Sequence, residues 1–136
     1  MYEYKIINRL GRLSLDQNRA WHIKSKLNLK LLRSGAKILE GRHDFSTFRS
    51  SACSAKSPIK NMSSVKVKKS GDEIVITFKS KSFLQNQVRS MVGSLKYLSE
   101  KKWDLKKFKK IFKSKKRHLC APPAPACGLY LKTVKY

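Results

Sequence analysis

Acidic residues are scarce in this chain, whose 136 residues include 8 Asp plus Glu against 32 Lys plus Arg, a formal net charge of +24. A surface that is merely solvated mixes charges of both signs, so this imbalance predicts salt-sensitive binding to a polyanion. RNA, DNA and anionic membranes all satisfy that condition. The sequence has no apolar run near the roughly 18 residues that a membrane span needs, and no lipidation signal, so we expect no membrane partner.

Cysteines are also few, and their spacing excludes the usual cysteine-based sites. Cys53, Cys120 and Cys127 are odd in number and form no C-x-x-C pair, so neither a disulfide framework nor a zinc site is expected. The H-x-E and P-C-x-x-C signature of the zinc deaminases is missing as well. No cofactor motif is present, and we expect no cofactor. The N-terminus lacks the apolar segment of a signal peptide, which makes the cytoplasm the expected compartment.

The remaining composition, 40% hydrophobic and 29% charged, is typical of one globular domain over residues 1–136. Hydrophobic periodicity predicts its elements in order. They are a strand over 2–8, irregular sequence over 9–26, a helix capped by Asn28 and ended by Gly41, a long loop over 43–60, a hairpin over 65–78, a helix over 83–98, a short helix from Asp104 and a strand over 129–136. The order β-α-β-β-α-(α)-β predicts an α+β, ferredoxin-like fold, an antiparallel sheet with helices on one face.

The most informative stretch reads F-L-Q-N-Q-V-R-S-M-V-G, from Phe83 to Gly93. Arg89 lies beside the apolar stripe of this helix, and a guanidinium at the edge of a core needs an anion to face. The alternative is a surface arginine whose stem covers the core. Gly93 costs a helix about 1 kcal/mol relative to alanine, which indicates that another backbone or a ligand approaches closely there.

Three further segments occur with this one in a fixed order: Y-E-Y-K-I at Tyr2, G-R-H-D-F-S-T-F-R from Gly41, and G-L-Y-L-K-T-V-K-Y from Gly128. Together they resemble the second half of the tRNA pseudouridine synthase A (TruA) family over essentially the whole chain. The family's R-T-D-A-G motif, which carries the catalytic aspartate, is absent from the sequence. The resemblance therefore implies a C-terminal half without the N-terminal half, inactive alone.

The resemblance also implies roles for individual residues. Arg89 matches the catalytic arginine that pairs with the absent aspartate, and Tyr2 matches the tyrosine that contacts the target base. Asp44, Phe45, Phe48 and Arg49 match D-F-S-x-F-R, which lines the cleft and helps to bind tRNA, and Leu129 and Tyr130 match a hydrophobic wall near the pocket. For Phe45 and Phe48 the habit of buried phenylalanine favours packing over base stacking. Asp44 accompanies the nucleophile in the family and is not expected to replace it.

The implied function is isomerisation of uridine to pseudouridine in the tRNA anticodon stem-loop, on a base flipped out of its stack. Expected partners are tRNA and either a separate N-terminal half or a homodimer partner. Two alternatives stay open. One is a non-catalytic RNA-binding module or remnant with the same fold, although the R-G-F-G-F signature of an RNA recognition motif is missing. The other is a structural protein of a ribonucleoprotein particle, supported by charge alone.

Overall fold

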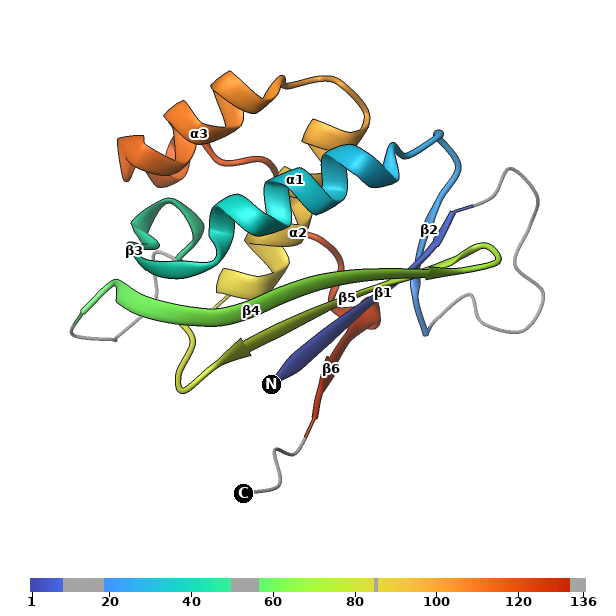
Figure 1. Ribbon diagram of the computed structural model, residues 1–136, viewed down its shortest axis with the longest axis horizontal. Coiled ribbons are helices and arrows are strands. Elements are labelled where there is room, and N and C mark those ends of the chain that lie inside the picture. Colours follow the sequence, from blue (N-terminus) through green and yellow to red (C-terminus); the bar gives the residue numbers. More distant parts are fainter. Residues whose placement is uncertain (9–18, 50–56, 85, 133–136) are drawn as a thin grey trace.

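The computed structural model describes residues 1–8, 19–49, 57–84 and 86–132. Six strands form a single sheet, and three helices cover one of its faces (Figure 1). The strands are β1 (Tyr2–Asn8), β2 (Trp21–Ile23), β3 (Gly41–Asp44), β4 (Ile59–Ser70), β5 (Glu73–Ser80) and β6 (Leu129–Leu131). The helices are α1 (Leu29–Leu39), α2 (Gln87–Ser99) and α3 (Leu105–Ser114), and short 3₁₀ turns cover Ser46–Phe48, Arg117–Leu119 and Ala126–Gly128. The predicted α+β class is confirmed.

The strand order β2-β1-β5-β4-β3, with β6 also paired to β1, contains the ferredoxin-like arrangement. Two strands share one edge of β1: β6 pairs with its first half at Tyr4↔Leu129, and β2 pairs with its second half at Ile7↔His22. The pairing of β1 with β2 is parallel, whereas the other pairings are antiparallel. The expectation of a wholly antiparallel sheet is therefore corrected at this strand.

The sheet has one buried face because its strands alternate in polarity. Tyr4 and Ile6 of β1, together with Ile74, Ile76 and Phe78 of β5, are at most 2% exposed. The residues between them point to the opposite face of the sheet, where side chains are partly exposed. The hairpin predicted over 65–78 is confirmed, with its turn at Gly71.

The helices begin and end at residues that the sequence marks. Asn28 caps α1 by accepting a hydrogen bond from the backbone N–H of Leu31, and Asp104 caps α3 by accepting one from that of Lys107. Gly41, just past the end of α1, has a φ of 101°, a value that glycine adopts without strain. Both helices bury an apolar face in the core, through residues such as Leu32 and Leu39 of α1 and Phe108 of α3.

Two predicted irregular regions contain strands. The segment 9–26 includes β2, and the loop predicted over 43–60 is shortened by β3 at one end and by the start of β4 at the other. Both missed strands have only three or four residues, too few for a recognisable alternation, and β3 has no apolar side chain. The helix predicted from Phe83 begins at Gln87, and the strand predicted over 129–136 is described only as far as Leu131. Residues 9–18, 50–56 and 133–136 lie outside the described residues.

Within the described ranges, no helix has the length and apolar character required to cross a membrane.

Candidate functional site

Tyr2, Arg89 and Leu129 come from three different elements and line one pocket of about 430 Å³. They belong to β1, α2 and β6, and the segment that enters α2 completes the wall. The other lining residues are Phe83, Leu84, Asn86, Gln87 and Val88. The pocket thus combines a phenol, a guanidinium and apolar walls, and no carboxylate is among its described lining residues.

Arg89 is fixed by the Pro-rich segment that follows α3. Its Nε donates a hydrogen bond to the carbonyl of Ala124 at 2.7 Å, and the N–H of Ala124 donates to the carbonyl of Arg89 at 2.9 Å. Because Nε is engaged, the remaining guanidinium N–H groups are the donors left for an anion. A planar guanidinium held in this way is well suited to grip a carboxylate in one geometry.

Gly93, one turn after Arg89, faces the same segment. A Cβ atom at Gly93 would lie 2.1 Å from the carbonyl oxygen of Pro122, closer than any side chain tolerates. The sequence predicted that another backbone or a ligand approaches this glycine closely, and the structure shows a backbone there. The absence of a side chain lets residues 121–125 lie against α2, where they meet Arg89.

Tyr2 is oriented by Phe83, which meets it edge to face with ring centroids 4.9 Å apart. Tyr4, two residues along β1, is fully buried, and its hydroxyl donates a hydrogen bond to the carbonyl of Pro125 at 2.5 Å. Burial raises the pKa of Tyr4 above its ordinary value; Cys127 adds to this rise and Arg89 opposes it. Tyr4 therefore stays neutral and serves as a structural residue of the core.

The entrance to α2 holds a residue whose individual role the sequence did not indicate. Gln87 is fully buried, and its side-chain oxygen accepts a hydrogen bond from the backbone N–H of Leu84 at 2.8 Å. Asn86 before it has a φ of 63°, in the left-handed region. Gln87 thereby closes the turn that presents Phe83 to Tyr2. The burial of this polar side chain at the start of a helix is what identifies the role of Gln87. Gln85 lies outside the described residues.

The residues of D-F-S-x-F-R lie elsewhere, beside α3. Phe45 and Phe48 are at most 1% exposed and pack against Phe112, each with ring centroids 5.4 Å from that ring. Partial burial acts to raise the pKa of Asp44, but hydrogen bonds from Ser46 and the charges of Lys115 and Arg49 hold it below its ordinary value. Arg49 itself is partly buried.

None of these four predicted residues lines the pocket of Tyr2 and Arg89 among the residues described. Tyr130 is also separate from that pocket. It pairs opposite Glu3 on the face of the sheet that the helices leave open, where Lys5 Nζ lies 4.8 Å from its ring centroid. Its hydroxyl donates to the carbonyl of Arg19. Of the eight predicted residues, the structure brings Tyr2, Arg89 and Leu129 together.

The described residues contain no group of three or more His, Cys, Asp or Glu side chains that could hold a metal ion. Cys120 and Cys127 are free thiols, and burial raises the pKa of Cys120. Cys53, the third cysteine, lies outside the described residues.

Comparison with known proteins shows the family of the chain. A family model described as tRNA pseudouridine synthase matches residues 36–136. Curated proteins named tRNA pseudouridine synthase A are similar over nearly the whole chain. That of Pelagibacter ubique is 62% identical over 136 residues, 100% of this chain and 55% of the relative. Those of Xanthobacter autotrophicus and Azorhizobium caulinodans are 47% and 44% identical over 99% of this chain, and 55% and 52% of the respective relatives.

The chain spans about half the length of the curated relatives it matches. The family model covers more than half of the chain, including α2 with Arg89 and β6 with Leu129, and the similarity to the relatives extends to Tyr2. The chain belongs to the tRNA pseudouridine synthase family.

Proposed function

We propose that this chain forms the arginine and tyrosine side of an active site that converts uridine to pseudouridine in the anticodon stem-loop of tRNA. The convergence of Tyr2, Arg89 and Leu129 on one pocket carries the proposal, because these residues come from opposite ends of the chain and from α2. Family membership supplies the reaction class. The proposed compartment is the cytoplasm, and tRNA is the proposed partner.

The reaction breaks the bond between N1 and C1′, turns the freed base and joins C5 to C1′; C5 then loses its proton and N1 gains one. In the proposed site an aspartate from an R-T-D-A-G segment reacts with the nucleoside. Arg89 holds that aspartate ionised and aimed, since a nearby guanidinium favours the charged form of a carboxylate. Tyr2 contacts the flipped base, and Leu129 supplies an apolar wall that helps to exclude water.

The R-T-D-A-G segment is absent from these 136 residues, and no carboxylate is among the described residues that line the pocket. We therefore propose that the residues 1–136 do not isomerise uridine without a polypeptide that carries that motif. A separate N-terminal half meets the requirement. A homodimer of this chain alone does not, although homodimerisation of the completed protein is compatible with the proposal.

Release of tritium from tRNA labelled at C5 of uridine tests the proposal. The chain alone is expected to match the blank without protein, and addition of an R-T-D-A-G half is expected to give turnover. In that mixture Arg89→Ala should lower turnover about a hundredfold or more, while the Kd for tRNA changes less than about threefold. Arg33→Ala, at an exposed position of α1, is the matched control and should leave turnover unchanged.

Two results contradict the proposal. Turnover by the chain alone shows that its own residues suffice, and unchanged turnover in Arg89→Ala removes the arginine from the reaction. If tRNA binds but no half with R-T-D-A-G restores turnover, the alternative of a non-catalytic RNA-binding remnant is favoured.

A further inference from the structure

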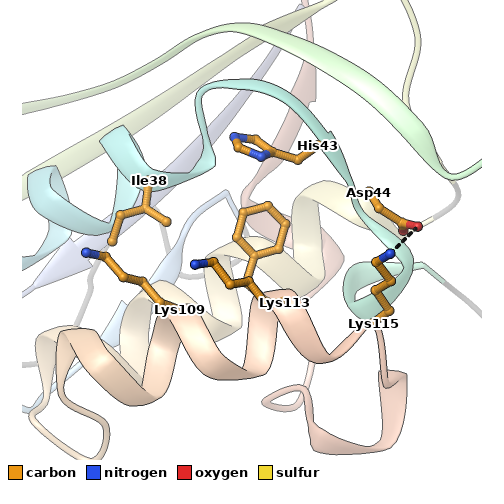
Figure 2. Close-up of a pocket in the computed structure, with 7 residues that line it drawn as sticks. Ile38, His43, Asp44, Lys109, Lys113 and Lys115 are labelled. Carbon is orange, nitrogen blue, oxygen red and sulfur yellow. Dashed lines mark ion pairs between the residues drawn. The ribbon is translucent and has the colours of Figure 1, made fainter.

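A second cavity, of about 300 Å³, lies between the end of α1, β3 and α3 (Figure 2). Its lining residues are Ile38, His43, Asp44, Lys109, Phe112, Lys113 and Lys115. It shares no described lining residue with the pocket of Tyr2 and Arg89. Any ligand here therefore contacts the protein away from the target uridine.

The lysines of this cavity exceed its acids by three to one. Asp44 is held ionised by the hydrogen bonds of Ser46, and its Oδ2 lies 3.8 Å from Nζ of Lys115. Among the described residues, Lys109 and Lys113 have no anionic partner. Figure 2 shows their amino groups beside the cavity, with the Asp44–Lys115 ion pair at its other end. The cavity thus has two cations without a counter-charge.

The rest of α3 increases this charge. The helix carries five lysines and no acid, and Lys109 and Lys113 are four residues apart, a spacing at which like charges repel. Lys106 and Lys107 in the first turn also oppose the helix dipole. These placements destabilise an isolated helix. A bound polyanion would neutralise the lysines and so remove their mutual repulsion.

The floor of the cavity is apolar and firmly supported. Phe112 is 6% exposed, and its ring lies 5.2 Å from that of His43 and 5.4 Å from that of Phe45, measured between centroids. Ile38, partly exposed on α1, forms the facing wall. An apolar wall next to unpaired ammonium groups suits a ligand that combines a flat, weakly polar part with a phosphate.

We propose that this cavity binds a phosphodiester segment of RNA, with Lys109 and Lys113 at the phosphates and the apolar wall against a ribose or base. An acidic peptide offers the charge without the flat ring, and a planar membrane surface does not enter a concave cavity. The inference goes beyond the proposed function, on which it rests for the choice of RNA as the polyanion. The cavity adds affinity and orientation, and no chemistry takes place in it.

Removal of the two unpaired charges tests the inference in the 136-residue chain. Lys109→Gln with Lys113→Gln is expected to weaken binding to unmodified tRNA about tenfold near physiological salt. The slope of log Kd against log salt concentration should fall by about two, one for each lost phosphate contact. Glutamine has nearly the same helix propensity as lysine, so α3 is retained, which circular dichroism checks.

Lys68→Gln with Lys69→Gln is the matched control. These exposed lysines lie near the turn of the β4–β5 hairpin, at the end of the sheet away from α3, and their removal lowers the net charge equally (Figure 1). The control should change the Kd less than about threefold and the slope by less than one. If both double variants weaken binding equally, tRNA senses only net charge and the inference is wrong.

Footprinting of the unaltered chain gives a second test that does not depend on variants. An amine-reactive reagent should modify Lys109 and Lys113 more slowly when tRNA is bound, with Lys68 and Lys69 unaffected. Polyglutamate at equal charge concentration should protect them less. Equal protection by polyglutamate, or no protection by tRNA, overturns the assignment. Neither readout requires uridine isomerisation, so a failure of the proposed enzymatic function is distinguishable from a failure of this inference.

Discussion

Gly93 illustrates how a single hydrogen atom sets the position of a functional side chain. The carbonyl of Pro122 occupies the space that a Cβ atom would need, at 2.1 Å, and the same segment hydrogen-bonds Arg89 through Ala124. Gly35 of α1 is also tightly packed, with a Cβ position 2.6 Å from Cδ2 of Leu95, but there the neighbour is the end of a flexible side chain. Substitution at the two glycines should therefore have different consequences.

Gly93→Ala is expected to destabilise the chain by about 2 kcal/mol, because the backbone of residues 121–125 has to move. Gly35→Ala is the control, since it gains the same helix propensity of about 1 kcal/mol and displaces only leucine methyl groups. Urea unfolding measures both. Equal losses of unfolding free energy at the two sites would show that the backbone of residues 121–125 moves as easily as the leucine side chains near Gly35.

The contents of the site were partly predictable from the residues. Arg89 and Gly93 were recognisable because a permanent charge and a missing side chain on an apolar helix edge each require an explanation. Gln87 and Phe83 were not, because their roles depend on a left-handed turn at Asn86 and on contact with β1, which no local pattern encodes. The separation of Phe45 from the Tyr2 pocket likewise depends on tertiary packing, which sequence order does not reveal.

At the scale of elements, a buried threonine joins the 3₁₀ turn at Ser46–Phe48 to the end of α3. Thr47 is fully buried, and its hydroxyl lies 3.0 Å from the carbonyl oxygen of Ile111 and 3.1 Å from that of Phe112. Ser114 also donates to the Ile111 carbonyl, so the Phe112 carbonyl depends more on Thr47. Carbonyls in the last turn of a helix need such outside donors.

Thr47→Val keeps the shape of the side chain and removes the donor. We expect a loss of about 1–2 kcal/mol in the free energy of unfolding, the cost of a buried hydrogen-bonding group left without its partner. Thr77→Val is the control, because Thr77 lies on the partly exposed face of β5, where a β-branched apolar residue is tolerated. If Thr47→Val has the same free energy of unfolding as Thr77→Val, the hydrogen bonds of Thr47 do not stabilise the fold.

The end of α2 is tied to the segment before α1 by a carboxylate. Glu100 accepts a hydrogen bond from the hydroxyl of Ser25, and its Oε1 lies 3.1 Å from Nζ of Lys96 and 3.6 Å from that of Lys102. Burial acts to raise the pKa of Glu100, but Ser25 and the two lysines lower it below its ordinary value. The ionised form is therefore the one that stabilises the fold.

Glu100→Gln should lower the free energy of unfolding by about 1 kcal/mol at pH 7. Because the pKa is lower in the folded state than in the unfolded state, this contribution is present above the unfolded pKa and is lost as the pH falls through the folded pKa. The difference between the two proteins should thus begin to shrink below the unfolded pKa of about 4.3, and it should vanish only below the lower folded pKa. Glu73→Gln, at a residue that makes no ion pair with any described residue, is the control. A difference that does not shrink at all between pH 7 and pH 3 would contradict the assignment.

The sequence predicts those elements that have a regular hydrophobic pattern or a recognisable helix cap. The alternation over 65–78 and the caps at Asn28 and Asp104 are local signals, and each agrees with the structure. β2 and β3 were missed because strands of three and four residues pair through their backbones, beside β1 and β4 whose alternation is strong. A short edge strand forms by pairing with a neighbouring strand, and the local sequence does not indicate which strand that is.

The whole molecule carries far more positive charge than its own acids neutralise. The described part of the chain holds five ion pairs. In four of them the lysine side chain is at least 43% exposed. Exposed pairs contribute about 0–1 kcal/mol each. Added salt screens these attractions, but it also screens the mutual repulsion of a chain with net charge +24.

We expect the repulsion to dominate, because unpaired lysines outnumber the ion pairs. An increase in sodium chloride from about 20 to 200 mM, which shortens the Debye length from roughly 20 Å to below 10 Å, should raise the Tm by several degrees. Replacement of the exposed Lys68, Lys69, Lys79 and Lys81 by glutamine should raise the Tm at low salt and reduce its response to salt. A Tm that falls as salt is added would mean that the five ion pairs outweigh the net charge.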